Sequence, residues 1–116
     1  MLRLTRAFEF VATHAVPDGS CSLFRHPGPH RHLWRVVLTL VAYPHERAAA
    51  AVFAPFAADL TEEFQGRCLN DVLPDLPTTA QLCRHLYDVA QGHYWDRVVA
   101  LRVYETPQLW IDYGRE

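Results

Sequence analysis

The sequence lacks the features that would mark a membrane, secreted or nucleic-acid-binding protein. No stretch approaches the about 18 consecutive apolar residues of a membrane-spanning helix, and the N-terminal segment alternates instead of forming a signal-peptide core. With 11 basic and 13 acidic residues, the formal net charge is only −2, so we expect neither nucleic acid nor a membrane as a partner. The three cysteines are odd in number and irregularly spaced, which does not predict a disulfide framework. We therefore expect a cytoplasmic protein.

Histidine, in contrast, is abundant. The chain of 116 residues has seven histidines, and three of them fall within "HPGPHRH" at positions 26–32. Half of all residues are hydrophobic, and the length suits one domain with a single core, so we expect one domain over residues 1–116.

The hydrophobic pattern predicts an α+β fold. Alternation up to His14, in which Arg6 is the one even position that breaks the apolar row, predicts a strand. Residues 15–29 predict a loop rich in proline and glycine, and the apolar run from His30 to Tyr43 predicts a second strand. Residues 45–64 have a helical pattern that Pro55 must interrupt or restart. The remaining expected elements are a connector over 70–77, a helix capped by Thr78 and Gln81 and ended by Gly92, and strands over 95–106 and 109–114. This order predicts a four-stranded antiparallel sheet with two helices on one face, and we place Phe8, Phe10, Phe53 and Phe56 in its core.

Three histidines are expected to converge. His30 and His32 are two residues apart on a strand and share one face, and His14 lies on the apolar face of the preceding strand. In an antiparallel hairpin the end of the first strand lies beside the start of the second. Three imidazoles with an open fourth position form the ligand set of a catalytic zinc. The alternative is that these histidines are ordinary surface residues. We interpret His45, His85 and His93 as surface or capping histidines.

Several motifs together resemble a known family. "LTRAFEFVATH", "HRHLWRVVLTL", "LND" before "PTTAQL" and the closing "RVYET" are similar, in order and over nearly the whole chain, to motifs of the 6-pyruvoyltetrahydropterin and 6-carboxytetrahydropterin synthases. The resemblance implies a T-fold protomer that assembles into a homo-oligomer, a hexamer built as a dimer of trimers around sheet barrels, with active sites between subunits. It implies a small-molecule pterin as partner and zinc bound by His14, His30 and His32. It also implies that Glu105 anchors the pterin ring, with Thr78 and Thr79 as neighbouring contacts.

The chain departs from the family pattern at the residues that move protons. His26 occupies the position of the usual loop cysteine, Gln65 and Gly66 replace an aspartate–histidine pair, and Ala80 replaces a glutamate. With a pKa near 6.5 in its ordinary state, His26 suits a general base. It is equally open as an additional zinc ligand or an inert loop residue. Cys21, in the same loop, is a candidate substitute for the base, whereas Cys68 lies near the replaced pair but occupies neither position. The alternative for both is an ordinary semi-buried thiol.

These observations leave three functions open. The first is a divergent zinc-dependent lyase acting on 7,8-dihydroneopterin triphosphate or a related dihydropterin, with His26 as candidate catalytic base. The second is a catalytically inactive paralogue that keeps the zinc site and binds a pterin or purine-like ligand. The third is a structural or partner protein in which the histidines are incidental.

Overall fold

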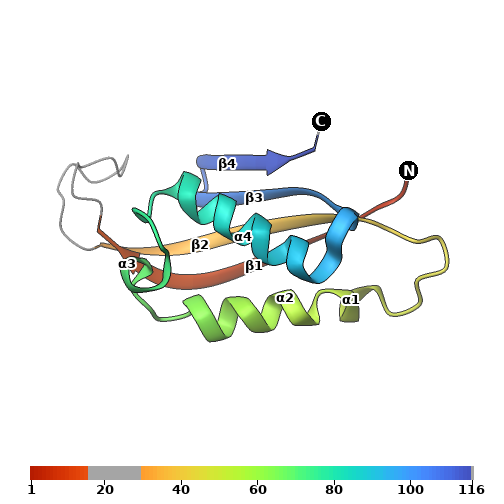
Figure 1. Ribbon diagram of the computed structural model, residues 1–116, viewed down its shortest axis with the longest axis horizontal. Helices are drawn as coiled ribbons and strands as arrows, with labels where there is room; N and C mark the ends of the chain where they lie inside the picture. The colour runs from red at the N-terminus through yellow and green to blue at the C-terminus, as the bar shows by residue number, and fades with distance from the viewer. Residues whose placement is uncertain (16–29, 116) are drawn as a thin grey trace.

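A four-stranded antiparallel sheet organises the protein, whose computed structural model describes residues 1–15 and 30–115 (Figure 1). The strands lie in the order β1-β2-β3-β4, so each pairs with the next along the chain. They are β1 (Arg3–His14), β2 (His30–Val41), β3 (Val98–Thr106) and β4 (Leu109–Gly114). The third strand begins three residues later than expected, because Trp95–Arg97 form a turn of 3-10 helix. β2 ends at Val41, two residues before the expected Tyr43. With these two differences in their bounds, all four predicted strands are confirmed.

The first helical segment runs from α1 (Ala49–Val52) through α2 (Ala54–Asp59) into a π-helical turn (Leu60–Phe64). Pro55 lies in the first turn of α2, where its missing N–H has no helical partner to lose, so the predicted restart is confirmed. The helix begins at Ala49 and not at residue 45. Its expected first turn is instead a turn in which the Glu46 N–H donates to the Tyr43 carbonyl (3.1 Å), and the Glu46 carboxylate accepts from Arg97 (2.7 Å).

The second long helix, α4 (Thr79–Tyr94), differs from expectation at its C-terminal end. Gly92 does not end it; the helix continues to Tyr94 and stops at Trp95, which takes a positive φ of 52°. The connector expected over 70–77 contains a further short helix, α3 (Leu69–Val72). Among the helices that the structure describes, none combines the length and apolar character needed to cross a membrane.

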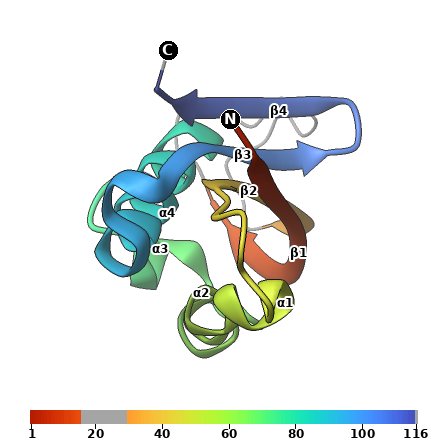
Figure 2. The same ribbon diagram turned by 90° about the vertical axis from the view of Figure 1, so that its right-hand side faces the viewer.

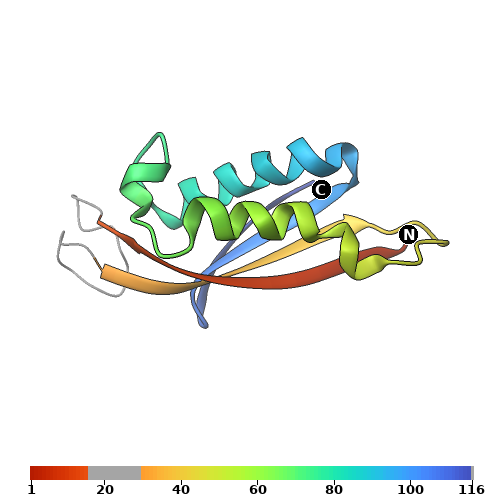
Figure 3. The same ribbon diagram turned by 90° about the horizontal axis from the view of Figure 1, so that it is seen from below.

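Both long helical segments cover the same face of the sheet (Figures 2 and 3). The core lies between these two layers, and Phe8 of β1 meets the rings of Phe53 and Phe56 edge-on at 5.8 and 5.2 Å. Phe8, Phe10, Phe53 and Phe56 are all buried, as predicted. Burial alternates along β1 up to its last residue, His14, and along β2 from its first residue, His30. The side of the sheet that faces the helices therefore ends in polar side chains. This places the candidate site at one end of the core.

Candidate metal centre

Three histidines meet where β1 ends and β2 begins. His14 pairs directly with His30 in the strand register, and His32 pairs with Ala12. The ring centroids lie 4.3 Å (His14–His30), 5.0 Å (His14–His32) and 4.7 Å (His30–His32) apart. One ring nitrogen from each residue lies within 4.8 Å of the others, an arrangement that can hold a single metal ion. The β1–β2 hairpin therefore brings the three histidines together, as predicted.

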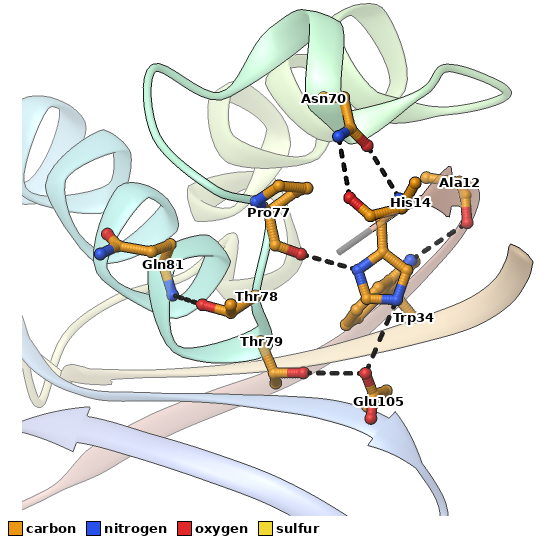
Figure 4. A network of polar contacts seen from close by, with 10 residues as sticks. Ala12, His14, Trp34, Asn70, Pro77, Thr78, Thr79, Gln81 and Glu105 are labelled. Atoms are coloured by element: carbon orange, nitrogen blue, oxygen red, sulfur yellow. Dashed lines mark hydrogen bonds and ion pairs between the residues drawn. The ribbon is translucent and has the colours of Figure 1, made fainter. Parts of the chain in front are cut away.

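His14 is oriented by a backbone carbonyl (Figure 4). Its Nδ1 lies 2.7 Å from the oxygen of Pro77, and because a carbonyl can only accept, Nδ1 carries the proton. The other nitrogen, Nε2, is buried and has no hydrogen-bond partner among the residues that the structure describes. The nearest acidic atom is Oε1 of Glu105, at 3.7 Å. A buried imidazole nitrogen with a free lone pair and a hydrogen-bonded opposite nitrogen is the usual arrangement of a metal-ligating histidine.

Burial also favours the neutral form of two of these histidines, His14 and His32. Desolvation lowers the pKa of His14 below its ordinary value of 6.5, although the hydrogen bond to Pro77 acts in the opposite direction. Desolvation likewise lowers the pKa of His32, against the field of Glu105, which raises it. Only a neutral imidazole offers a lone pair to a metal. The donor set therefore fits zinc, which accepts three nitrogen ligands and an open fourth position.

The indole of Trp34 packs against two of the histidines. Trp34 is fully buried, and its Nε1 donates to the carbonyl of Ala12 (3.2 Å), which ties β2 to β1. Its ring lies edge-on to His14 at 5.1 Å and to His32 at 5.2 Å. A wide, rigid side chain thus restricts the orientation of two of the three candidate ligands.

The residues expected to contact a pterin lie beside this cluster. Glu105, in the penultimate position of β3, is buried, and Thr79 donates its hydroxyl to Oε1 of Glu105 (3.2 Å). Thr78 is the N-cap of α4, as predicted, and its hydroxyl oxygen accepts from the Gln81 N–H (3.2 Å). The Thr78 N–H, which a full capping box would pair with the Gln81 side chain, instead donates to the Leu76 carbonyl (2.9 Å). Glu105 thus lies next to His14 and is hydrogen-bonded to Thr79, whereas the side chain of Thr78 is hydrogen-bonded within the first turn of α4.

Gln65 and Gly66, at the positions of the family's aspartate and histidine, are used to bind the outer edge of β1. The side-chain oxygen of Gln65 accepts from the Val11 N–H (3.0 Å), and the Gly66 N–H donates to the Val11 carbonyl (2.7 Å). Gly66 has a φ of 74°, a conformation that side chains with a Cβ rarely adopt. Ala80 is exposed in the first turn of α4.

Sequence reasoning missed the role of Asn70, which holds the chain just beyond His14. Its Oδ1 accepts from the Ala15 N–H and its Nδ2 donates to the Ala15 carbonyl, both at 2.9 Å. The half-buried thiol of Cys68 also donates to this Oδ1 (3.5 Å). The asparagine of "LND" was part of the family resemblance, but no pattern of spacing shows that its amide pairs with a backbone residue 55 positions away.

The remaining candidates lie elsewhere or outside the described residues. His26 and Cys21 belong to the part of the chain that the structure does not describe. His45 stacks on Tyr43, His85 lies edge-on to Phe64, and His93 pairs with Asp59 at 2.5 Å. Within residues 1–15 and 30–115, the cluster of His14, His30 and His32 is the only group of three or more potential metal ligands.

The four-stranded antiparallel sheet with its helices on one face has the architecture of a T-fold domain. The sequence matches the family model described as 6-pyruvoyl tetrahydropterin synthase over residues 3–116. The chain therefore belongs to the 6-pyruvoyl tetrahydropterin synthase family, as the motifs predicted. Among curated proteins, none matches this sequence significantly.

Solved structures share the fold at low sequence identity. The 6-pyruvoyl tetrahydropterin synthase of Caenorhabditis elegans superposes with a TM-score of 0.82 at 12% identity, covering 99% of this chain and 96% of that one. An uncharacterized protein from Wolinella succinogenes gives 0.77 at 15% identity, with 99% and 98% covered. The 6-pyruvoyl tetrahydropterin synthase of Plasmodium falciparum gives 0.64 at 11% identity, with 97% and 98% covered. At such identities the likeness establishes the fold alone.

Proposed function

We propose that this protein is a divergent zinc-dependent lyase that acts on 7,8-dihydroneopterin triphosphate or a related dihydropterin. The observation that carries the proposal is the buried Nε2 of His14, which faces two further imidazoles in a chain of this family. His14, His30 and His32 would hold the zinc and leave a fourth position for the substrate. Bound zinc supplies Lewis-acid polarisation of a substrate hydroxyl or carbonyl.

Glu105 and Thr79 would bind the substrate. A carboxylate can accept from both the ring N–H and the exocyclic amine of a pterin, and the Thr79 hydroxyl already orients Oε1 of Glu105. Thr78 would add a contact through its hydroxyl proton. Because Glu105 lies only 3.7 Å from Nε2 of His14, a second assignment is open, in which it binds the substrate side chain and not the ring. A pterin without a side chain separates the two: Glu105→Gln weakens its binding only if Glu105 anchors the ring.

We assign the proton-transferring role to His26, which stands at the position of the family's loop cysteine. Gln65 and Gly66 hydrogen-bond to Val11 of β1 and offer no titratable group, which supports a base outside this pair. If His26 is the base, His26→Ala abolishes turnover while zinc content stays the same. If it is a fourth zinc ligand, the same variant loses zinc affinity. If both are unchanged, His26 is inert.

The direct test is turnover. Zinc-loaded protein is incubated with 7,8-dihydroneopterin triphosphate and the pterin products are separated by chromatography, with an active family enzyme alongside. We expect product formation that His14→Ala abolishes and His85→Ala retains. If the reference enzyme is active and this protein forms no product, the proposed reaction on this substrate is refuted.

The second candidate is a non-catalytic protein that binds a pterin or purine-like ligand. It is supported by Gln65 and Gly66, which hydrogen-bond to the edge of β1 at positions where the family has titratable side chains. This function predicts ligand binding without turnover, and loss of that binding in Glu105→Ala. Metal analysis of protein purified without a histidine tag separates both candidates from a protein with incidental histidines, which would contain no stoichiometric zinc.

A further inference from the structure

We propose that Thr78 is a positioning residue for the metal centre: by capping α4 it holds the Pro77 carbonyl on Nδ1 of His14 and thereby fixes the ring in its metal-binding tautomer. This inference rests on the proposed zinc function of the histidines. It gives Thr78 a role exerted through Pro77 and His14, distinct from a contact with the substrate.

Three polar groups of Thr78 form hydrogen bonds. Its hydroxyl oxygen accepts from the Gln81 N–H (3.2 Å), its carbonyl accepts from the Leu82 N–H (3.0 Å), and its own N–H donates to the Leu76 carbonyl (2.9 Å). Two of these bonds tie Thr78 to the first turn of α4, and the third closes a tight turn with the preceding loop. The backbone at Thr78 is therefore fixed from both sides.

This fixation passes directly to the Pro77 carbonyl, because the Pro77 carbonyl and the Thr78 N–H belong to one planar peptide group. That peptide is trans, so the two groups point in opposite directions. While the Thr78 N–H is bound to Leu76, the Pro77 oxygen is directed away from it, and it lies 2.7 Å from Nδ1 of His14 (Figure 4). The proline ring further restricts the backbone on its N-terminal side.

The tautomer of His14 decides whether its inner nitrogen can bind a metal. With the proton on Nδ1, Nε2 presents a lone pair toward the cluster. With the proton on Nε2, that nitrogen would donate toward Oε1 of Glu105, 3.7 Å away, and could not ligate. A buried carboxylate on the inner side favours the second tautomer, and the Pro77 carbonyl on the outer side favours the first. The cap at Thr78 keeps the outer partner in place.

The test compares three substitutions at Thr78 with a control at the other end of α4. Thr78→Ala removes the capping oxygen, whereas Thr78→Ser and Thr78→Asn retain one; the asparagine variant also removes the hydroxyl. Tyr94→Phe removes a hydrogen bond from Tyr94 to the Val52 carbonyl (2.7 Å) and serves as a matched loss of one polar contact. Zinc affinity is measured by competition with a chromophoric chelator, and the tautomer by long-range ¹H–¹⁵N correlation spectra of metal-free, histidine-labelled protein.

We expect Thr78→Ala to weaken zinc binding by about 10-fold or more, in the range typical of residues that support metal ligands, and to move the His14 proton partly to Nε2. Thr78→Ser, Thr78→Asn and Tyr94→Phe should stay close to the wild type in both measurements. The inference is overturned if Thr78→Ala retains zinc affinity and the Nδ1–H tautomer, or if Thr78→Asn behaves like Thr78→Ala. Wild-type protein that binds no zinc would refute the proposed function, while the tautomer spectra would still test the inference.

Discussion

At the scale of single residues, the environment of His14 and His32 favours the neutral imidazole that a metal requires. Burial lowers the pKa of both His14 and His32, and the Pro77 carbonyl occupies the nitrogen of His14 that points away from the cluster. Burial in the core thus lowers the cost of deprotonating these two histidines when a metal binds. The same burial makes the metal-free protein sensitive to acid.

We predict that the stability of the metal-free protein falls as the pH drops below 6.5. The unfolded chain binds protons on His14 and His32 at their ordinary pKa of 6.5, whereas the native state binds them only at lower pH. Protons therefore favour the unfolded state in this window, and stability is lost as the pH falls through the native pKa. Urea unfolding at pH 7.5, 6.5 and 5.5 measures the loss. His14→Asn combined with His32→Asn should flatten this pH dependence, and His85→Asn should not.

A second residue-scale prediction concerns the thiol of Cys83. Burial raises the pKa of Cys83 to about 11, and the thiol donates to the carbonyls of Leu101 and Ile111 at 3.8 and 3.7 Å. At pH 8 roughly one thiol in a thousand would be ionised, and the thiolate is the reactive form. We expect iodoacetamide to leave Cys83 unmodified in the native protein at pH 8 and to modify it in urea. Native labelling of Cys83 as fast as that of half-buried Cys68, followed by peptide mass spectrometry, would contradict this.

At the scale of elements, residues 65–70 act as a clasp on the outer edge of β1. The Gly66 N–H donates to the Val11 carbonyl, and the Thr13 N–H donates to the Arg67 carbonyl. Asn70 then binds both backbone groups of Ala15. This clasp continues the pairing of β1 beyond His14, at the point where the chain leaves the sheet.

We predict that Asn70→Ala destabilises the protein by about 1–3 kcal/mol, the sum of two ordinary hydrogen bonds, and loosens the end of β1. Amide exchange should accelerate most at Ala15. The matched control is Gln65→Ala, which removes one side-chain bond to the Val11 N–H, farther from His14. It should accelerate exchange at Val11 and leave Ala15 protected. Equal exchange at Ala15 in wild type and Asn70→Ala would show that the clasp does not hold this residue.

The elements also show which features a sequence can reveal. Strand periodicity placed His14, His30 and His32 on one face correctly, because side chains alternate strictly along a strand. Gly92 was wrongly expected to end α4, since its freedom to adopt a positive φ is used only if the chain turns there, and the turn comes at Trp95. The carbonyl of Pro77 and the amide of Asn70 could not be predicted as partners of β1, because backbone groups carry no sequence signal and both contacts span more than 50 residues.

At the scale of the whole molecule, the two edge strands of the sheet and the exposed apolar side chains of β4 point to self-association. β1 and β4 are the edge strands of the sheet. Within the described residues, the backbone contacts to the outer edge of β1 reach only residues 11–15. β4 exposes four large side chains, each between 36% and 44% exposed: Leu109, Trp110, Ile111 and Tyr113. An edge strand presents unpaired backbone N–H and C=O groups, which a strand of another chain can pair with while it covers the apolar side chains.

We therefore propose a homo-oligomer in which β4 of one copy pairs with β1 of the next. Ile111→Lys should place a charge in this contact and shift the protein to monomers, measured by sedimentation velocity. Trp95→Lys is the control, because Trp95 is 76% exposed but lies on the turn between α4 and β3, outside the sheet. Zinc binding should survive in the monomer, because His14, His30 and His32 all come from one chain. A monomeric wild type, or an Ile111→Lys variant that still assembles, would contradict edge pairing through β4.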